Sequence, residues 1–445
     1  MNREKTELFH AGLSLAEANE LSAYGYSSGT LPIRYLGLPL MHRKLKVGEY
    51  SPLIDKLHIR FQAWATKSLS FAGRALLLKT VITGLVIFWI STFSLPKSCI
   101  NKIESLCSKF LWSGSIDRRA NAKVSWKTLC LPKAEGGIGL INFKRWNITL
   151  LLRFVWLLFS GSASLWVAWH RLHNCHSSYH FWSQPEVQSQ TWNWRCLLRL
   201  RDLASSFLIS EIKDGQSTSF DGTRRLRIRI DVCVAEACND SGWRLSNPRS
   251  DEEVNLHAYL STIMFPSPEL GSDSFAWDAD GIVRPSYSSA KTWEVLRPRG
   301  TIQPSTKHIW FSGATSKHDF HMWVTNLNCL PTRDKLSSWG MQVPTCCCIC
   351  TTEPESRDHL MLSCPFVLTL WAEIRIRLGS PSVLKMLVVQ TLVYSVWRQR
   401  NNMLHSNCIS PLLVVFKDIN RQVINSIYAL KHMKKFRNLL LNWLI

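Results

Sequence analysis

Five of the chain's 14 cysteines fall between Cys346 and Cys364, and a histidine lies among them. Taking Cys347 as the first ligand gives the spacing C-x2-C-x8-H-x4-C, whose other members are Cys350, His359 and Cys364. Two thiolates two residues apart fit the tight turn that holds one half of a tetrahedral zinc site. Four protein ligands leave no coordination position open, so the pattern predicts a structural zinc ion rather than a catalytic one.

The first ligand is not fixed by the spacing, because Cys346 or Cys348 could take the place of Cys347. Cys350 and Cys364 belong to every register. The alternative to a metal site is a cluster of buried or incidental thiols. Spacing of this kind indicates metal binding in an intracellular chain.

The residues around the cysteines follow a distinctive order. It runs through Trp310-Phe311, an apolar helix, Leu330-Pro331-Thr332-Arg333-Asp334, the cysteines, Glu355-Ser356-Arg357-Asp358-His359-Leu360, Cys364-Pro365 and Trp371. This order resembles the zinc-binding domain at the C-terminal end of reverse transcriptases from plant LINE-type (non-LTR) retrotransposons. Two earlier segments resemble the same enzymes, namely Leu31–Leu40, which leads into their thumb, and Glu135–Leu140, which follows it. The resemblance extends over residues 2–405 and is weakest over 166–270.

The resemblance implies a chain of five segments. They are the end of the palm and start of the thumb (1–47), a helical thumb with the following helix (48–160), a mixed linker with a β-hairpin (161–285), the zinc-binding domain (286–378) and C-terminal helices with a basic end (379–445). Within the linker, the alternating run Arg224–Arg229 is typical of an exposed strand edge.

Apolar residues recur at helical spacing in most of the chain, so we expect a mainly α fold with small β elements. The helices are predicted at 15–22, 48–67, 72–89, 98–112, 147–159, 288–296, 384–405 and 412–430. Asp280-Gly281 predicts the turn of a hairpin within Phe275–Val283.

The predicted helix at 48–67 is amphipathic, with an apolar stripe that includes Leu53, Leu57 and Phe61. Lys56, Arg60 and Lys67 fall on the other face. A basic helical face can follow a phosphate backbone, so these three residues are candidate nucleic-acid contacts. A solvated helix face is the alternative.

The whole chain is strongly basic, with 53 Lys and Arg against 32 Asp and Glu, a net charge of +21 and a pI near 9.6. Such an excess favours a polyanionic partner, and RNA and DNA are the first candidates. A basic surface without a specific partner is the alternative. The polar start lacks a secretory signal, so we expect a nuclear or cytoplasmic protein. The apolar stretch Leu76–Leu95 is expected to be a buried helix, with no membrane partner.

No Ser/His/Asp set, phosphate loop or acid–base carboxylate pair stands out, and no small-molecule substrate is expected. Asp278 and Asp280 are better explained as hairpin residues than as polymerase metal ligands. Polymerisation needs carboxylates that hold two divalent ions, and by the resemblance these would precede Met1. The sequence therefore predicts a non-enzymatic, nucleic-acid-binding C-terminal portion of a retrotransposon RNA-directed DNA polymerase. A non-functional relic and a zinc-stapled protein-interaction module are the alternatives.

Overall fold

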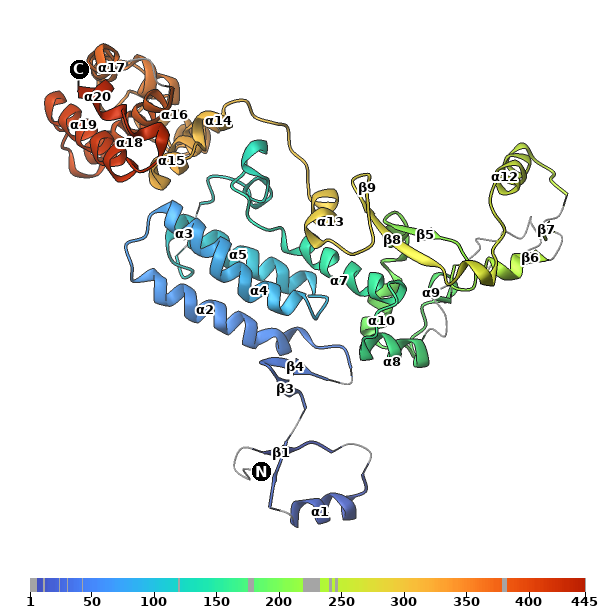
Figure 1. Ribbon diagram of the computed structural model, residues 1–445. Coiled ribbons are helices and arrows are strands. Elements are labelled where there is room, and N and C mark those ends of the chain that lie inside the picture. Colours follow the sequence, from blue (N-terminus) through green and yellow to red (C-terminus); the bar gives the residue numbers. More distant parts are fainter. Residues whose placement is uncertain are drawn as a thin grey trace. The chain divides into compact units, whose positions relative to one another are not determined.

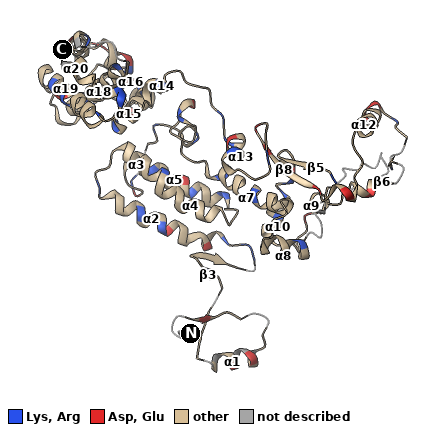
Figure 2. Ribbon diagram, in the orientation of Figure 1, with Lys and Arg blue, Asp and Glu red and all other residues tan. Residues whose placement is uncertain are grey.

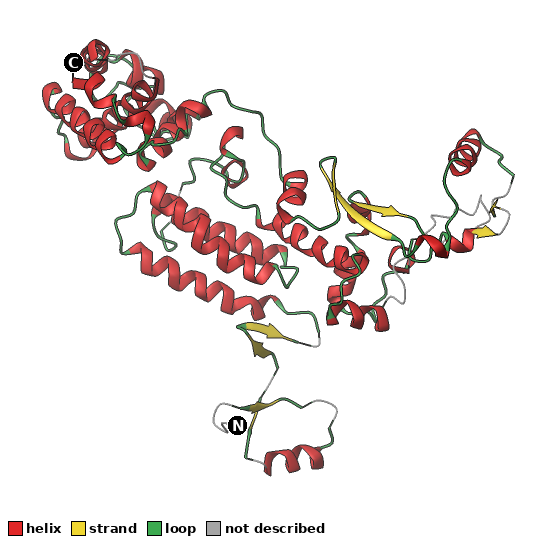
Figure 3. Ribbon diagram, viewed as in Figure 1, coloured by secondary structure: helices red, strands yellow, loops and turns green. Residues whose placement is uncertain are grey.

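The computed structural model describes residues 6–10, 13–23, 25–29, 31–41, 43–118, 121–174, 180–218, 233–239, 242–244, 247–377 and 382–444. Helices dominate the described residues, and the strands are few and short (Figures 1 and 3). The prediction of a mainly α chain with small β elements is therefore confirmed. The predicted strand edge Arg224–Arg229 lies outside the described residues.

The predicted helices are all found, with bounds that differ by a few residues. The helices are α1 Leu15–Ala23, α2 Ser51–Ala65, α3 Phe71–Leu77, α4 Thr83–Ile90, α5 Lys97–Ser113, α6 Trp126–Leu129, α7 Phe143–Phe159, α8 Leu165–His173, α9 His180–Ser183, α10 Trp192–Leu198, α11 Arg201–Ser205, α12 Asp251–Ser261, α13 Ser289–Leu296, α14 Thr306–Ile309, α15 Ser316–Asn326, α16 Arg333–Ser338, α17 Pro365–Arg377, α18 Ser382–Ser406, α19 Leu412–Ala429 and α20 Leu439–Leu444.

The strands form small two- and three-stranded sheets. They are β1 Glu7–Leu8 with β2 Ser27–Ser28, β3 Ile33–Tyr35 with β4 Leu38–Leu40, β5 Leu208–Glu211 with β8 Ser274–Ala279 and β9 Ile282–Arg284, and β6 Cys238–Asn239 with β7 Gly242–Trp243. The predicted hairpin is β8–β9, and Asp280 and Gly281 take the positive φ angles of 66° and 72° that its turn requires. Pairing of β8 with the distant β5 was not predicted.

The chain divides into two compact units, each made of separate stretches. The first contains residues 1–55, 85–100 and 143–297, and the second contains 56–84, 101–142 and 298–445. The five-segment division expected from the sequence stays a prediction.

The first unit has a tryptophan-rich core around α7 and β8. Trp277 stacks on Phe207 at a centroid distance of 5.2 Å and meets Trp156 edge to face at 5.9 Å. Asn147 is buried in α7, where its side chain donates to the carbonyl oxygens of Ile90 and Phe93. This buried amide satisfies backbone groups at and just after the end of α4, which explains a polar residue among the buried positions of α7.

The second unit combines the C-terminal part of α2 with α3, most of α5 and the helices α14 to α20. Phe61 and Phe110 pack at 5.0 Å, and Phe71 stacks on Phe320 at 5.7 Å. The indole of Trp323 donates to the carbonyl oxygen of Gly136 at 2.9 Å. These contacts join residues far apart in the sequence, so this unit is held together by its aromatic side chains.

One described helical stretch, Phe71–Ile90, is long and apolar enough to cross a membrane by length and composition. Leu78, Ile82, Val86 and Ile90 are buried along one side of it, at intervals of four residues. Other members, including Leu76, are exposed. Burial thus covers one side of the stretch, and the absence of a membrane partner stays a prediction.

Candidate metal centre

Cys347 and Cys350 lie in a hairpin-like loop after α16. The N–H of Cys347 donates to the carbonyl oxygen of Glu353 at 2.6 Å, and the N–H of Glu355 donates to that of Thr345 at 2.9 Å. These two bonds pair the arms of the loop and close a tight turn at its tip. Both cysteines are therefore held on one short, hydrogen-bonded segment.

His359 and Cys364 are positioned by a single helical turn, His359–Ser363, that precedes α17. The hydroxyl of Ser356 accepts the N–H of His359 at 3.0 Å, which anchors the start of this turn. The N–H of Cys364 donates to the carbonyl oxygen of His359 at 2.7 Å. The turn therefore presents the imidazole and the thiol together toward the loop.

The four predicted ligands converge. The three sulfur atoms and a ring nitrogen of His359 all lie within 4.8 Å of one another. Sγ of Cys350 and Nε2 of His359 are 3.3 Å apart. A tetrahedral ion about 2.3 Å from each sulfur needs ligand atoms about 4 Å apart, so the four ligand atoms already lie close to the spacing that zinc requires. Cys347 and Cys364 are fully buried, and His359 is 9% exposed.

Backbone N–H groups point at all three sulfur atoms. Each cysteine accepts hydrogen bonds from the residues two and three positions after it, namely Ile349 and Cys350 for Cys347, Thr352 and Glu353 for Cys350, and Phe366 and Val367 for Cys364. Such donors favour the thiolate over the thiol. The same local geometry is thus repeated at each sulfur, and it stabilises negative charge there.

The charges of the site follow from these contacts. A hydrogen bond from Cys364 is the main reason that the pKa of Cys347 falls to about 5, and the same bond raises the pKa of Cys364. Burial opposes ionisation of Cys350, but the N–H groups of Glu353 and Thr352 outweigh it and lower its pKa. Burial also opposes a charged His359, yet its sulfur neighbours raise its pKa. The site therefore attracts positive charge.

Of the three adjacent cysteines, Cys347 is the one whose sulfur joins the cluster. Cys346 is exposed, and its carbonyl oxygen accepts from the guanidinium of Arg333. Cys348 is buried with its sulfur 3.7 Å from the carbonyl oxygen of Arg400, and burial raises its pKa to about 11. The geometry selects the register that begins at Cys347.

A buried ion pair lies beneath the loop and was not predicted. Arg400 and Glu355 meet at 2.7 Å, with side chains 3% and 0% exposed. Glu355 also accepts the backbone N–H groups of Arg333 and Cys348, and Arg400 donates to the carbonyl oxygen of Pro331. One carboxylate therefore ties α16, the cysteine loop and α18 together. In the sequence, the only sign of a role for Glu355 was its position shortly before His359, and its partner Arg400 could not be inferred from that position.

The basic face, defined as Lys56, Arg60 and Lys67, is exposed, while Leu57 and Phe61 of α2 are buried. Figure 2 shows Lys and Arg residues on α2. None of its three members forms an ion pair with another residue that the structure describes. Lys56 and Arg60 lie on α2, so the predicted apolar and basic sides of this helix are confirmed for them, whereas Lys67 follows the end of α2 at Ala65 and is not part of the helix. Contact with nucleic acid stays a prediction.

Asp278 and Asp280 sit in the β8–β9 hairpin, as the sequence indicates. The N–H of Asp278 donates to the carbonyl oxygen of Phe207 at 2.7 Å, and Asp280 occupies the turn. Neither carboxylate belongs to a metal-ligating group within the described part of the chain. Their geometry is that of hairpin residues.

The donor set fits zinc. Three sulfurs and one imidazole are a common ligand set of structural zinc sites, and the repeated N–H···S bonds match the charge that thiolate ligands carry. All four positions of a tetrahedron would be filled by protein, so the ion would link the cysteine loop to the helical turn without activating a substrate.

Comparisons with known proteins agree with this geometry. Residues 287–371 match the family described as zinc-binding in reverse transcriptase. The chain is also 24% identical over 366 residues to an Arabidopsis thaliana protein named "putative ribonuclease H protein". That alignment covers 76% of this chain, and the chain spans 57% of the relative's length. The match places a reverse-transcriptase-type zinc-binding region around the four ligands, and the two comparisons together fit a protein related to retrotransposon reverse transcriptases.

Proposed function

Since residues 287–371 match the zinc-binding region of reverse transcriptases, we propose that this chain is a nucleic-acid-binding portion of a LINE-type, non-LTR retrotransposon RNA-directed DNA polymerase. The observation that carries the proposal is the convergence of Cys347, Cys350, His359 and Cys364 inside the matched region. We assign these four residues as the ligands of one structural zinc ion. The zinc holds a scaffold in place and takes no part in chemistry.

RNA and DNA are the proposed partners. The net charge of +21 supports them, since lysines and arginines that neutralise phosphates release the condensed counterions of the nucleic acid into solution. The basic face supplies cations that are exposed and free of ion pairs within the described residues. Lys56 and Arg60 are one helical turn apart, so both side chains can reach neighbouring phosphates on one backbone. We assign no catalytic role to Asp278 and Asp280.

Salt-dependent binding tests the proposal. Replacing Lys56, Arg60 and Lys67 by glutamine should weaken binding to every sequence alike. It should lower the slope of log K against log salt by about 2 to 3 for duplex DNA, because each lost phosphate contact removes about 0.9.

The matched control replaces Lys307, Lys385 and Lys417, which are also exposed residues of the second unit. This control changes the net charge by the same amount and should leave most of the slope intact. An equal decrease of the slope in both variants would show that binding depends on the total charge and not on the position of the basic face. An unchanged slope in the first variant would show that the basic face is only solvated.

A further inference from the structure

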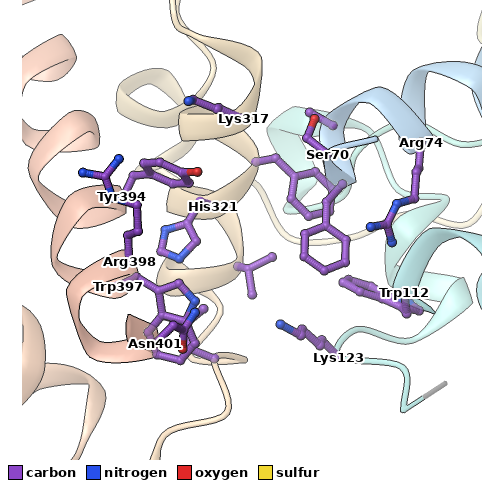
Figure 4. A pocket seen from close by; sticks show the side chains of 15 residues that line it. Ser70, Arg74, Trp112, Lys123, Lys317, His321, Tyr394, Trp397, Arg398 and Asn401 are labelled. Carbon is purple, nitrogen blue, oxygen red and sulfur yellow. The ribbon is translucent and has the colours of Figure 1, made fainter. Parts of the chain in front are cut away.

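A cavity of about 310 Å³ opens within the second unit, between α3 and α5 on one side and α15 and α18 on the other (Figure 4). It is distinct from the metal centre, because none of the four ligands lines it. Neither the metal ligands nor the residues of the basic face line this cavity.

The walls of the cavity are aromatic. Phe71, Trp112, Phe320, Tyr394 and Trp397 all line it. Phe71 lies against Phe320 with ring planes only 10° apart, and Trp112 packs on both at about 6 Å. Tyr394 and Trp397 come from α18 and flank His321 (Figure 4). Flat hydrophobic surfaces therefore face the space from both sides, as a planar aromatic guest requires.

The rim of the cavity is basic. Arg74, Lys123, Lys317 and Arg398 line it, and no Asp or Glu is among the described lining residues. Arg398 is paired with Asp418. Lys123 and Lys317 rest 5.2 and 5.0 Å from the ring centroids of Phe71 and Tyr394. Neither ammonium group forms an ion pair with a carboxylate in the described ranges, so both are available to an anionic guest.

His321 supplies a polar group at the centre. Its ring projects from α15 into the space between Tyr394 and Trp112 (Figure 4). Both ring nitrogens are shielded from solvent and have no hydrogen-bond partner among the described residues. Burial lowers the pKa of His321 to about 3, so the ring is neutral and offers one donor and one acceptor. Buried polar groups are normally satisfied, so an unpartnered imidazole that projects into a cavity points to a ligand that exchanges hydrogen bonds with it.

We propose that this cavity binds one unpaired nucleobase of a single-stranded nucleic acid, with the phosphates on either side of that nucleotide at Lys123 and Lys317, which lie at opposite ends of the cavity (Figure 4). The base stacks between the aromatic walls, and its edge exchanges hydrogen bonds with His321. A base inside a duplex is already stacked and paired, so the site selects single-stranded regions. This inference rests on the proposed function and adds a binding mode that the basic face on α2 does not provide.

Fluorescence anisotropy on the zinc-loaded full chain tests the inference. The probes are labelled 10-nucleotide single strands of RNA and of DNA with the same sequence. A second version of each strand has abasic central nucleotides, and a DNA duplex completes the set. The wild-type chain should bind the intact single strands on the order of tenfold more tightly than the abasic ones, since stacking of one base is worth that much. The RNA and DNA arms show which sugar is preferred.

Two substitutions locate the effect. His321→Phe keeps an aromatic ring but removes both nitrogens, and Lys317→Met removes a cation from an exposed residue of α15. Each should lower single-strand affinity several-fold and leave duplex affinity unchanged. His432→Phe and Lys385→Met make the same changes at exposed positions outside the cavity and should alter neither.

The outcomes separate this inference from the proposed function. If abasic and intact strands bind equally well, and His321→Phe and Lys317→Met bind like the wild type, the cavity takes no base, while salt-dependent duplex binding still supports the proposed function. If no probe binds at any salt concentration, both proposals fail. Because Lys317 is exposed, Lys317→Met keeps the test valid should His321→Phe fold poorly.

Discussion

Replacing Arg400 by methionine should loosen the cysteine loop even when zinc is present. The substitution leaves the carboxylate of Glu355, which is 0% exposed, with backbone N–H groups as its remaining donors. Removing one partner of a buried ion pair costs about 3–5 kcal/mol, because the other charge stays buried and uncompensated. A double variant that also carries Glu355→Gln should recover at least about 1 kcal/mol of this, since the buried charge is gone.

Hydrogen exchange of the peptide covering residues 345–364 is the assay. Since each 1.4 kcal/mol is a factor of ten, a local loss of 3 kcal/mol or more makes these amides exchange on the order of a hundredfold faster or more. Arg421→Met is the control, because Arg421 is 74% exposed in its ion pair with Asp418 and such pairs contribute about 0–1 kcal/mol. If Arg400→Met exchanges within twofold of the wild type over this segment, the pair does not hold the loop and the reasoning is wrong.

Two further predictions concern metal removal and pH. Chelation of zinc, or His359→Ala, should expose residues 330–371 to protease while residues 48–112 stay protected. The reason is that metal binding contributes folding energy only to the segment that the metal links. Equal digestion of both regions would contradict this. Burial raises the pKa of Asp319 to about 7 against the opposing effect of Lys133, so the folded chain binds a proton that the unfolded chain has lost above about pH 4. The contribution of Asp319 to stability should therefore fall as pH rises from about 4 to about 7. In urea unfolding, Asp319→Asn should gain stability relative to the wild type between pH 5 and pH 8; the same difference between variant and wild type at both pH values would refute the assignment.

Features encoded within a short stretch of sequence were predictable. The spacing of Cys350, His359 and Cys364 predicted that a loop and a short helical turn carry the metal ligands. The spacing of apolar residues in α2 predicted that Leu57 is buried and that Lys56 is exposed. Asp280-Gly281 specifies its own turn because both residues tolerate positive φ. In each case the determining residues lie within about 20 positions of one another.

Features that depend on distant residues were not predictable. Glu355 and Arg400 are 45 residues apart, and the sequence around either residue does not indicate that the other is its partner. The pairing of Leu208 with Trp277 in β5 and β8, and the cavity between Phe71 and Tyr394, arise from the same kind of long-range packing. The choice of Cys347 over its neighbours also required the structure, because the sulfur of Cys348 lies instead against the carbonyl oxygen of Arg400, 52 residues away.

The zinc content of the purified chain tests the central claim most directly. Elemental analysis should find one zinc per chain in the wild type and in Cys346→Ser, whose sulfur lies outside the cluster. Cys364→Ser should hold little or none, because it removes a fully buried ligand shared by every register. A wild-type chain without stoichiometric zinc, or a Cys364→Ser chain that retains it while Cys346→Ser loses it, would contradict the assignment of Cys347, Cys350, His359 and Cys364 as the metal centre.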